Sequence, residues 1–182
     1  MNIKPLSWIY ILLLLFVLQI PAAVAASKAE IDARVEEALE TFYEETTAGK
    51  KLAQKAAGIL VFPKVIKAGF GIGGEYGEGA LLINNKTIDY YSTASASIGL
   101  QFGAQVKSQV ILFMEEKALK NFRDSDGWEA GVDGSVAVAT QGAAKEIDTQ
   151  TAKEPIIGFI FSNKGLMYNL TFEGSKISHI KK

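Results

Sequence analysis

Hydrophobic residues change their spacing once along the chain, from a helical repeat to the alternation typical of strands. Between Ala29 and about Glu45 they recur every three or four residues, at Ile31, Val35, Leu39 and Phe42. This stripe predicts an amphipathic helix. Lys50 to Ala57 predicts a short second helix, with Gly58 as its C-terminal cap. We therefore expect residues 27–57 to form a helical segment.

After Gly58 the repeat shortens to two residues, which predicts strands. The segment 59–62 is a short buried run that Pro63 is expected to end. The clearest alternation runs from Ala94 to Val106, with apolar residues at even positions and serine, glycine and glutamine at odd positions. We expect the even-numbered side chains to face the core and the odd-numbered ones to form a polar face.

Further short runs of this kind continue to the C-terminus, and Asn84-Asn85-Lys86 predicts a tight turn between two of them. We expect about eight or nine strands in one antiparallel assembly. The predicted fold class is α+β, with N-terminal helices packed on a Gly-rich antiparallel β sandwich or small barrel.

The segment from Gly69 to Gly74 satisfies the G-x-G-x-x-G pattern of dinucleotide sites. Such a site needs a helix directly after the glycines, so that its amides and dipole meet the pyrophosphate. Here residues 75–79 follow, which cannot start a helix and add negative charge. Glycine at alternate positions instead predicts close backbone approach or strong curvature in a sheet.

Residues 1–26 differ from the rest and are typical of a signal peptide. Lys4 supplies the positive charge, Leu6 to Ile20 form the apolar run, and Ala23-Val24-Ala25 is a small-residue cleavage site after Pro21. The alternative is an uncleaved anchor, because alanines extend the apolar tract to residue 26. We expect one mature domain over 27–182, mainly β over 58–182, exported to the periplasm.

Composition excludes several classes of function. The chain has no cysteine, a single histidine (His179) and a formal net charge of −1. These facts argue against a thiol nucleophile, a zinc site and a nucleic-acid binder. The acids at 124, 126, 129 and 133 do not fit the spacing of a calcium loop and indicate a polar turn. We therefore expect no enzyme activity, no cofactor and no metal.

Charge changes sign within the first part of the mature chain. Residues 28–45 carry seven acids and two bases, whereas residues 46–74 carry five lysines and no acid. Lysines beside apolar groups favour an anionic lipid headgroup, each adding ~1 kcal/mol near a charged surface. The alternative is an ordinary solvated face paired with the acidic helix. The candidate lipid-binding residues are Lys50, Lys51, Lys55, Lys64, Lys67, Phe62 and Phe70.

Several glycine-anchored segments, taken together, resemble the SYLF domain family. In chain order these are Val61-Phe62-Pro63-Lys64, residues 68–79, residues 96–105, Phe113-Met114, residues 118–122, residues 127–133 and Gly165-Leu166-Met167. The resemblance covers nearly all of the mature chain. It implies a lipid-binding module without catalytic residues.

In eukaryotic members of that family the domain binds phosphoinositides, and in fungal endocytic adaptors it also binds actin filaments. The bacterial members are exported single-domain proteins. Lipid contacts of eukaryotic members are associated with a basic N-terminal segment, whereas residues 28–45 here are acidic. Lys50, Lys51 and Lys55 are the nearest equivalent. Actin is not an expected partner of an exported protein.

The leading hypothesis is therefore a periplasmic module that contacts anionic lipid without catalysis. A structural or interaction protein of the cell envelope, with a protein partner, is the alternative. A hydrolase that uses the polar sheet face at Ser97, Gln101, Gln105 and Asp133 is a third hypothesis.

Overall fold

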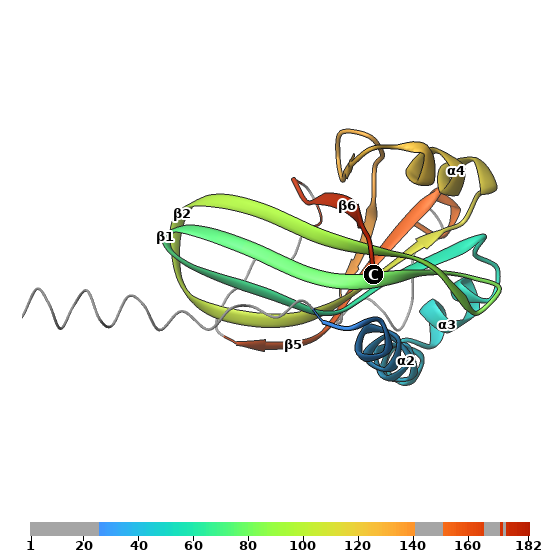
Figure 1. Cartoon of the computed structure of the whole chain (residues 1–182), viewed down its shortest axis with the longest axis horizontal. Coiled ribbons are helices and arrows are strands. Elements are labelled where there is room, and N and C mark those ends of the chain that lie inside the picture. The colour runs from blue at the N-terminus through green and yellow to red at the C-terminus, as the bar shows by residue number, and fades with distance from the viewer. Residues whose placement is uncertain (1–25, 141–150, 166–171, 173) are drawn as a thin grey trace, which may run out of the picture.

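The computed structural model describes residues 26–140, 151–165, 172 and 174–182 (Figure 1). The helices are α2 (Lys28–Glu45), α3 (Thr47–Ala53), α4 (Glu116–Asp124) and a short 3-10 turn (Thr151–Lys153). The strands are β1 (Gly58–Ile83), β2 (Lys86–Phe113), β3 (Trp128–Glu129), β4 (Ala137–Thr140), β5 (Ile156–Gly165) and β6 (Lys176–Ile180). Apart from Ala26, the predicted leader lies outside the described residues. Within them, no helix has the length and apolarity needed to span a membrane.

Two long strands dominate the sheet, where the sequence predicted several short ones. β1 and β2 form one antiparallel hairpin, closed by a turn in which Asn84 and Asn85 have positive φ angles of 52° and 60°. This confirms the predicted turn. The prediction that Pro63 ends a strand is wrong. Pro63 lies at a register shift between Phe62 and Val65, where a residue without an N–H interrupts the ladder but not the strand.

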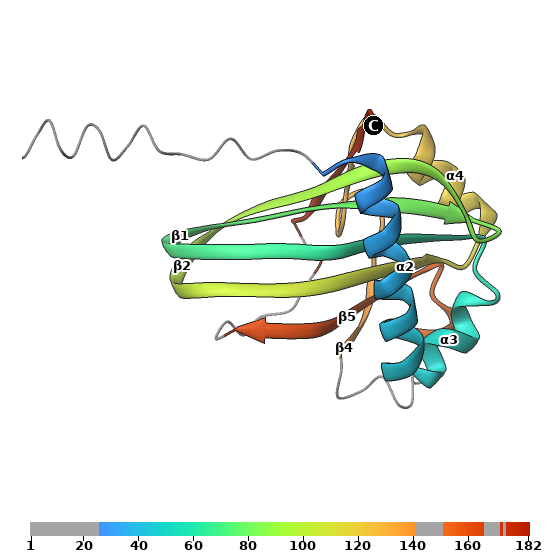
Figure 2. The ribbon, with the colours of Figure 1, turned by 60° about the horizontal axis from the view of Figure 1, so that its bottom comes forward.

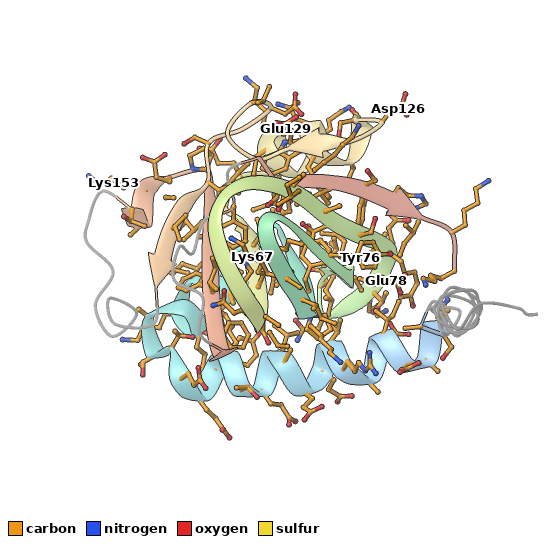
Figure 3. All side chains as sticks on the ribbon, turned by 90° about the vertical axis from the view of Figure 1, so that its left-hand side faces the viewer. Lys67, Tyr76, Glu78, Asp126, Glu129 and Lys153 are labelled. Carbon is orange, nitrogen blue, oxygen red and sulfur yellow. The ribbon has the colours of Figure 1, made fainter. Side chains whose placement is uncertain are left out.

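The hairpin is bent over at its middle. Phe70 pairs with Phe102 and Ile72 with Ile98, so β2 has three residues at the bend where β1 has one. Figure 3 shows the bend of β1 lying within that of β2, as this difference in path length requires. The bend forms one end of the molecule (Figures 1 and 2).

Glycines bring the two arms of β1 into close contact. A Cβ on Gly79 would lie 1.9 Å from the carbonyl oxygen of Val61, and one on Gly77 would lie 2.8 Å from that of Lys64. No side chain fits at either distance. The predicted role of the alternating glycines, close backbone approach in a sheet, is confirmed.

The core lies on both faces of the sheet where the arms meet β5. On one face α2 buries Ile31, Val35 and Phe42 against strand residues that include Val61 and Phe159. On the other face Leu119 and Phe122 of α4 pack with Trp128. Figure 2 shows α2 lying across the strands. The predicted apolar stripe of the first helix is confirmed.

The fold class is α+β, as predicted. The six strands follow the order β3-β6-β2-β5-β4, with β1 paired to β2, and the bends divide β1 and β2 so that the curled sheet has eight segments. One expectation needs correction: β4 pairs with β5 in parallel, so the assembly is not wholly antiparallel.

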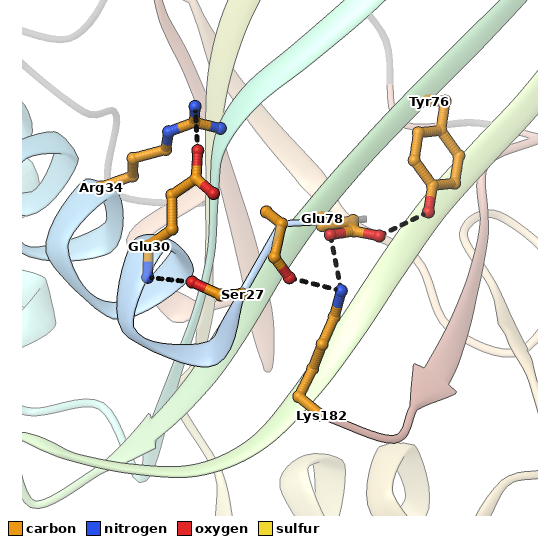
Figure 4. Close-up of polar contacts among 7 residues, drawn as sticks. Ser27, Glu30, Arg34, Tyr76, Glu78 and Lys182 are labelled. Carbon is orange, nitrogen blue, oxygen red and sulfur yellow. Dashed lines mark hydrogen bonds and ion pairs between the residues drawn. The ribbon is translucent and has the colours of Figure 1, made fainter. Parts of the chain in front are cut away.

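Both ends of the described chain meet at β1. The Ser27 hydroxyl caps α2 by accepting from the Glu30 amide at 3.2 Å. The Lys182 ammonium donates to the Ala26 carbonyl and to Glu78, each at 2.9 Å (Figure 4). Tyr76 donates to the other Glu78 oxygen at 2.9 Å. Burial acts to raise the pKa of Glu78, but the hydrogen bonds from Lys182 and Tyr76 outweigh it and lower this pKa.

A partly buried carboxylate contact fixes α2 on the hairpin. The Tyr90 hydroxyl donates to both carboxylate oxygens of Asp32 at 2.9 Å, and Thr87 donates to one of them at 3.1 Å. Burial, with help from the Asp32 hydrogen bond and charge, raises the pKa of Tyr90 to about 12.

We expect an Asp32→Asn variant to lower the pKa of Tyr90, because it removes a negative charge beside the phenol but leaves the burial. Spectrophotometric titration of tyrosine at alkaline pH measures this change. Tyr91 is an internal control, because burial and Asp89 raise its pKa to about 12 without Asp32. Neutral Tyr90 stabilises the fold below pH 10, and that stability is lost as the pH rises from 10 to about 12. An unchanged titration curve would contradict the assigned contact.

Candidate functional site

The five candidate lysines do not form one patch. Lys50, Lys51 and Lys55 are exposed on α3 and directly after it. This helix lies at the end of the molecule opposite the hairpin bend (Figure 1). Lys50 also lies 5.8 Å from the ring centre of Tyr43, over its face. These three lysines form a first basic group, beside the acidic helix α2.

Lys64 and Lys67 lie on β1, toward the bend. Lys64 is exposed, whereas Lys67 is half-buried and lies close enough to Lys107 to lower that lysine's pKa. The single compact cluster that the sequence suggested is therefore two separate groups. Six to nine extended residues separate Gly58 from these lysines, which corresponds to ~20–30 Å along the strand.

Of the two candidate phenylalanines, only Phe62 has a side chain among the described ones. Phe62 is completely buried in the core beside α4, so it is not available to a lipid surface. The run 59–62 was predicted to be buried, and a residue of that core cannot also be a surface contact. The side chain of Phe70 lies outside the described residues.

At the bent end of the hairpin, the face of β2 that was predicted to be buried is exposed, and the face that was predicted to be exposed is buried. Ala94, Ala96 and Ala104 are exposed, whereas Gln105 and Lys107 are buried. The side chains of 97–102 lie outside the described residues. The expectation that the even-numbered residues face the core is therefore wrong for the described part of this strand.

β1 shows the same reversal beside β2. Ile66, Ile72 and Tyr76 all point outward, and the last two are 71% and 52% exposed. Gly73, Gly77 and Gly79 face inward, and so does Glu75. The inner face therefore consists of glycines and polar side chains, and the large apolar residues lie outside. We name Ile66, Ala68, Ile72, Tyr76, Ala94, Ala96 and Ala104 the outer apolar surface.

An ion pair occupies the interior of the bent end. The Lys107 ammonium lies 3.0 Å from a Glu75 oxygen, with only 1% and 4% of the two side chains exposed. Gln109 donates to the other Glu75 oxygen at 3.2 Å. Burial lowers the pKa of Lys107 more than the attraction of Glu75 raises it. These groups join the second arm of β1 to the second arm of β2.

Net charge over the bent end is positive. Between residues 64 and 77, and between 90 and 114, the bases are Lys64, Lys67 and Lys107, and Glu75 is the only acid. Since Glu75 is buried against Lys107, residues 64–77 and 90–114 present no exposed carboxylate. An apolar surface with basic residues behind it is suited to an anionic, amphipathic partner.

A second feature is a groove of about 990 Å³ between α4 and the hairpin. Asp89 lies there 3.5 Å from both the Arg123 guanidinium and Nε2 of His179. His179 is exposed, as expected of a surface residue. Among the described residues, no group of three or more acids and histidines is arranged to hold a metal ion.

Comparison with known proteins supports one family. The family model Ysc84, described as "Las17-binding protein actin regulator", matches residues 94–182. No curated protein matches the chain significantly. The matched residues include much of β2 and all later elements, and therefore Ala94, Ala96 and Ala104 of the outer apolar surface. Ysc84 is a family of binding-type domains, and it is the family predicted from the glycine-anchored segments. Residues 94–182 of the chain belong to the SYLF domain family.

Proposed function

We propose that this chain is an exported, non-catalytic module that binds anionic lipid of the cell envelope. The observation that carries the proposal is the outer apolar surface, with Lys64 exposed beside it and no exposed acid among residues 64–77 and 90–114. Lipid offers both complements of such a surface, an apolar phase and a negatively charged boundary.

Export rests on the signal-peptide pattern of residues 1–26. The periplasm is the compartment that this leader and the absence of cysteine favour. The description of the family model names an actin regulator, but an exported chain has no access to actin. We therefore propose lipid as the partner in place of actin.

Flotation with lipid vesicles tests the proposal. We expect the protein, isolated from an exporting host, to float with vesicles that contain an anionic lipid and to float less with zwitterionic vesicles. High salt should weaken this binding, because it screens charges at the surface. Equal recovery with both kinds of vesicle would contradict a preference for anionic lipid.

Charge reversal then identifies the basic group that contributes. Changing Lys50, Lys51 and Lys55 together to Glu tests the α3 group, and Lys64→Glu tests the β1 group. Each lysine that meets the surface contributes ~1 kcal/mol, so a contributing triple change should weaken binding by at least ~100-fold. Lys117→Glu, at an exposed position of α4, is the control. Full binding by both variants would contradict a role of these lysines.

A protein partner in the envelope is the second candidate. The exposed face of α2, with its glutamates at 36, 37, 40 and 44, favours a basic protein surface. The same flotation experiment separates the candidates, because this one expects no recovery with either kind of vesicle.

A further inference from the structure

The outer apolar surface is made of side chains that ordinary folding would bury. Ile72, at 71% exposed, is among the most exposed large apolar residues described, and Ile66 and Tyr76 lie on the same side of β1. Single exposed apolar residues are common on proteins. Here they lie on the part of β1 that bends, with Ile72 next to the bend and Ile66 and Tyr76 five residues from residue 71 on either arm (Tyr76 is labelled in Figure 3). Such a grouping marks an interaction surface.

The backbone at this end is paired along one edge of each strand. β1 and β2 pair along both arms up to the bend, at Phe70 with Phe102 and at Ile72 with Ile98. The other edge of β1 has no partner strand among the described residues, so contact with an apolar phase is made by side chains and not by the backbone. The charged groups Glu75 and Lys107 are inside, where they neutralise each other.

Charge distinguishes a membrane from a second copy of the chain. Lys64 is exposed on β1 two residues before Ile66, and the described residues of the two bends, 64–77 and 90–114, include no exposed acid that could pair with the lysine of another copy. Two such ends would repel each other. An anionic membrane instead attracts the ammonium group, since a long lysine stem lets the charge reach the headgroups while apolar neighbours lie deeper.

We propose that the bent end of the β1–β2 hairpin inserts its outer apolar surface into the acyl region of an anionic membrane. This inference rests on the proposed lipid binding and goes further. It assigns Ile66 and Ile72 as the penetrating residues and places Tyr76, whose hydroxyl donates to Glu78, at the headgroup boundary. It states that the protein enters the bilayer and does not only adhere to headgroups.

Because the chain has no cysteine, a single introduced thiol can report on one position. Ile72→Cys, labelled with an environment-sensitive fluorophore, is the test position. Val132→Cys is the matched control, since Val132 is also apolar and is 74% exposed in the segment between β3 and β4. Lipids with a quencher on the acyl chain measure how deeply each label lies.

With anionic vesicles we expect a blue shift and strong acyl-chain quenching at position 72, and neither change at position 132. A protein that floats while its label at 72 remains in water would overturn insertion and leave lipid binding intact. A protein that does not float would overturn both proposals. Equal quenching at 72 and 132 would also overturn the inference, because the orientation would then be nonspecific.

Substitution provides an independent measurement. We expect Ile72→Ser and Ile66→Ser each to lower vesicle affinity about tenfold, because each removes one apolar side chain from the buried contact. Val132→Ser should leave affinity unchanged.

Light scattering of the free protein tests whether a second copy of the chain covers the outer apolar surface instead of a membrane. We expect a monomer, and a dimer that Ile72→Ser dissociates would assign the surface to a second copy of the chain.

Discussion

A Gly79→Ala variant should lose about 3 kcal/mol or more of folding free energy, at the upper end of the range for overpacked interiors. The added methyl group would lie 1.9 Å from the Val61 carbonyl oxygen and 2.8 Å from the Phe62 ring. The first neighbour is backbone and cannot rotate away. The two arms of β1 would have to separate, with loss of the packing between them. Urea denaturation followed by circular dichroism measures the change.

Gly74→Ala is the control in the same strand. Gly74 is exposed, and its nearest neighbour would lie 3.9 Å from the new methyl group. We expect a change of at most ~0.5 kcal/mol in unfolding free energy. If the Gly79 and Gly74 variants were equally stable, the arms of β1 would not be in the close contact described here.

Local features could be predicted from the sequence because each depends on nearby residues. The spacing of Ile31, Val35 and Phe42 requires a helix with one apolar face, and the structure buries that face. Asn84 and Asn85 adopt the positive φ angles that a tight hairpin turn needs. Alternating glycines implied close approach, which the arms of β1 show.

The orientation of the faces could not be predicted in the same way. Alternation from Ala94 to Val106 shows that the two faces of the strand differ, but not which face lies inside. The usual rule places apolar residues inside, and it fails here because the glycine-lined space between the arms is narrow. Lys107 and Glu75 are 32 residues apart in the sequence, so no local pattern relates their opposite charges.

The candidate site was found only in part for a related reason. The five lysines between residues 46 and 74 are close in sequence. An extended strand is long for its number of residues, however, so Lys64 and Lys67 lie far from α3. The exposure of Ile72 and Tyr76 depends on the bend in the β1–β2 hairpin. The sequence analysis predicted several short strands in place of this hairpin, so it could not predict the bend. The signal in the sequence that could have indicated this exposed surface was the alternation of apolar residues with glycines in β1.

Removal of one member of the buried ion pair is the second large effect that we expect. Lys107→Met leaves the Glu75 carboxylate almost fully buried, with the hydrogen bond from Gln109 still in place. An uncompensated buried charge costs about 3–5 kcal/mol of folding free energy. A double variant, Lys107→Met with Glu75→Leu, should recover most of this loss because no buried charge remains. A double variant no more stable than Lys107→Met would contradict this account.

An exposed pair supplies the control for the buried one. Arg34 and Glu30 of α2 are 2.6 Å apart, and their side chains are 44% and 47% exposed. Water already solvates both groups, so Arg34→Met should change the unfolding free energy by at most ~1 kcal/mol. A loss at Arg34 as large as that at Lys107 would show that burial is not the cause.

The dependence of stability on pH identifies the lysine itself. Burial lowers the pKa of Lys107 below its ordinary value of 10.5. Between that lowered pKa and 10.5 the unfolded chain binds more protons than the folded one, so raising the pH in this window stabilises the fold. The wild-type protein should therefore gain unfolding free energy relative to Lys107→Met as the pH rises toward 10.5. Taking the difference between the two proteins cancels the ionisation of Tyr90 and Tyr91, which both retain. Parallel pH profiles would mean that the Lys107 ammonium is as well solvated in the folded protein as in the unfolded chain.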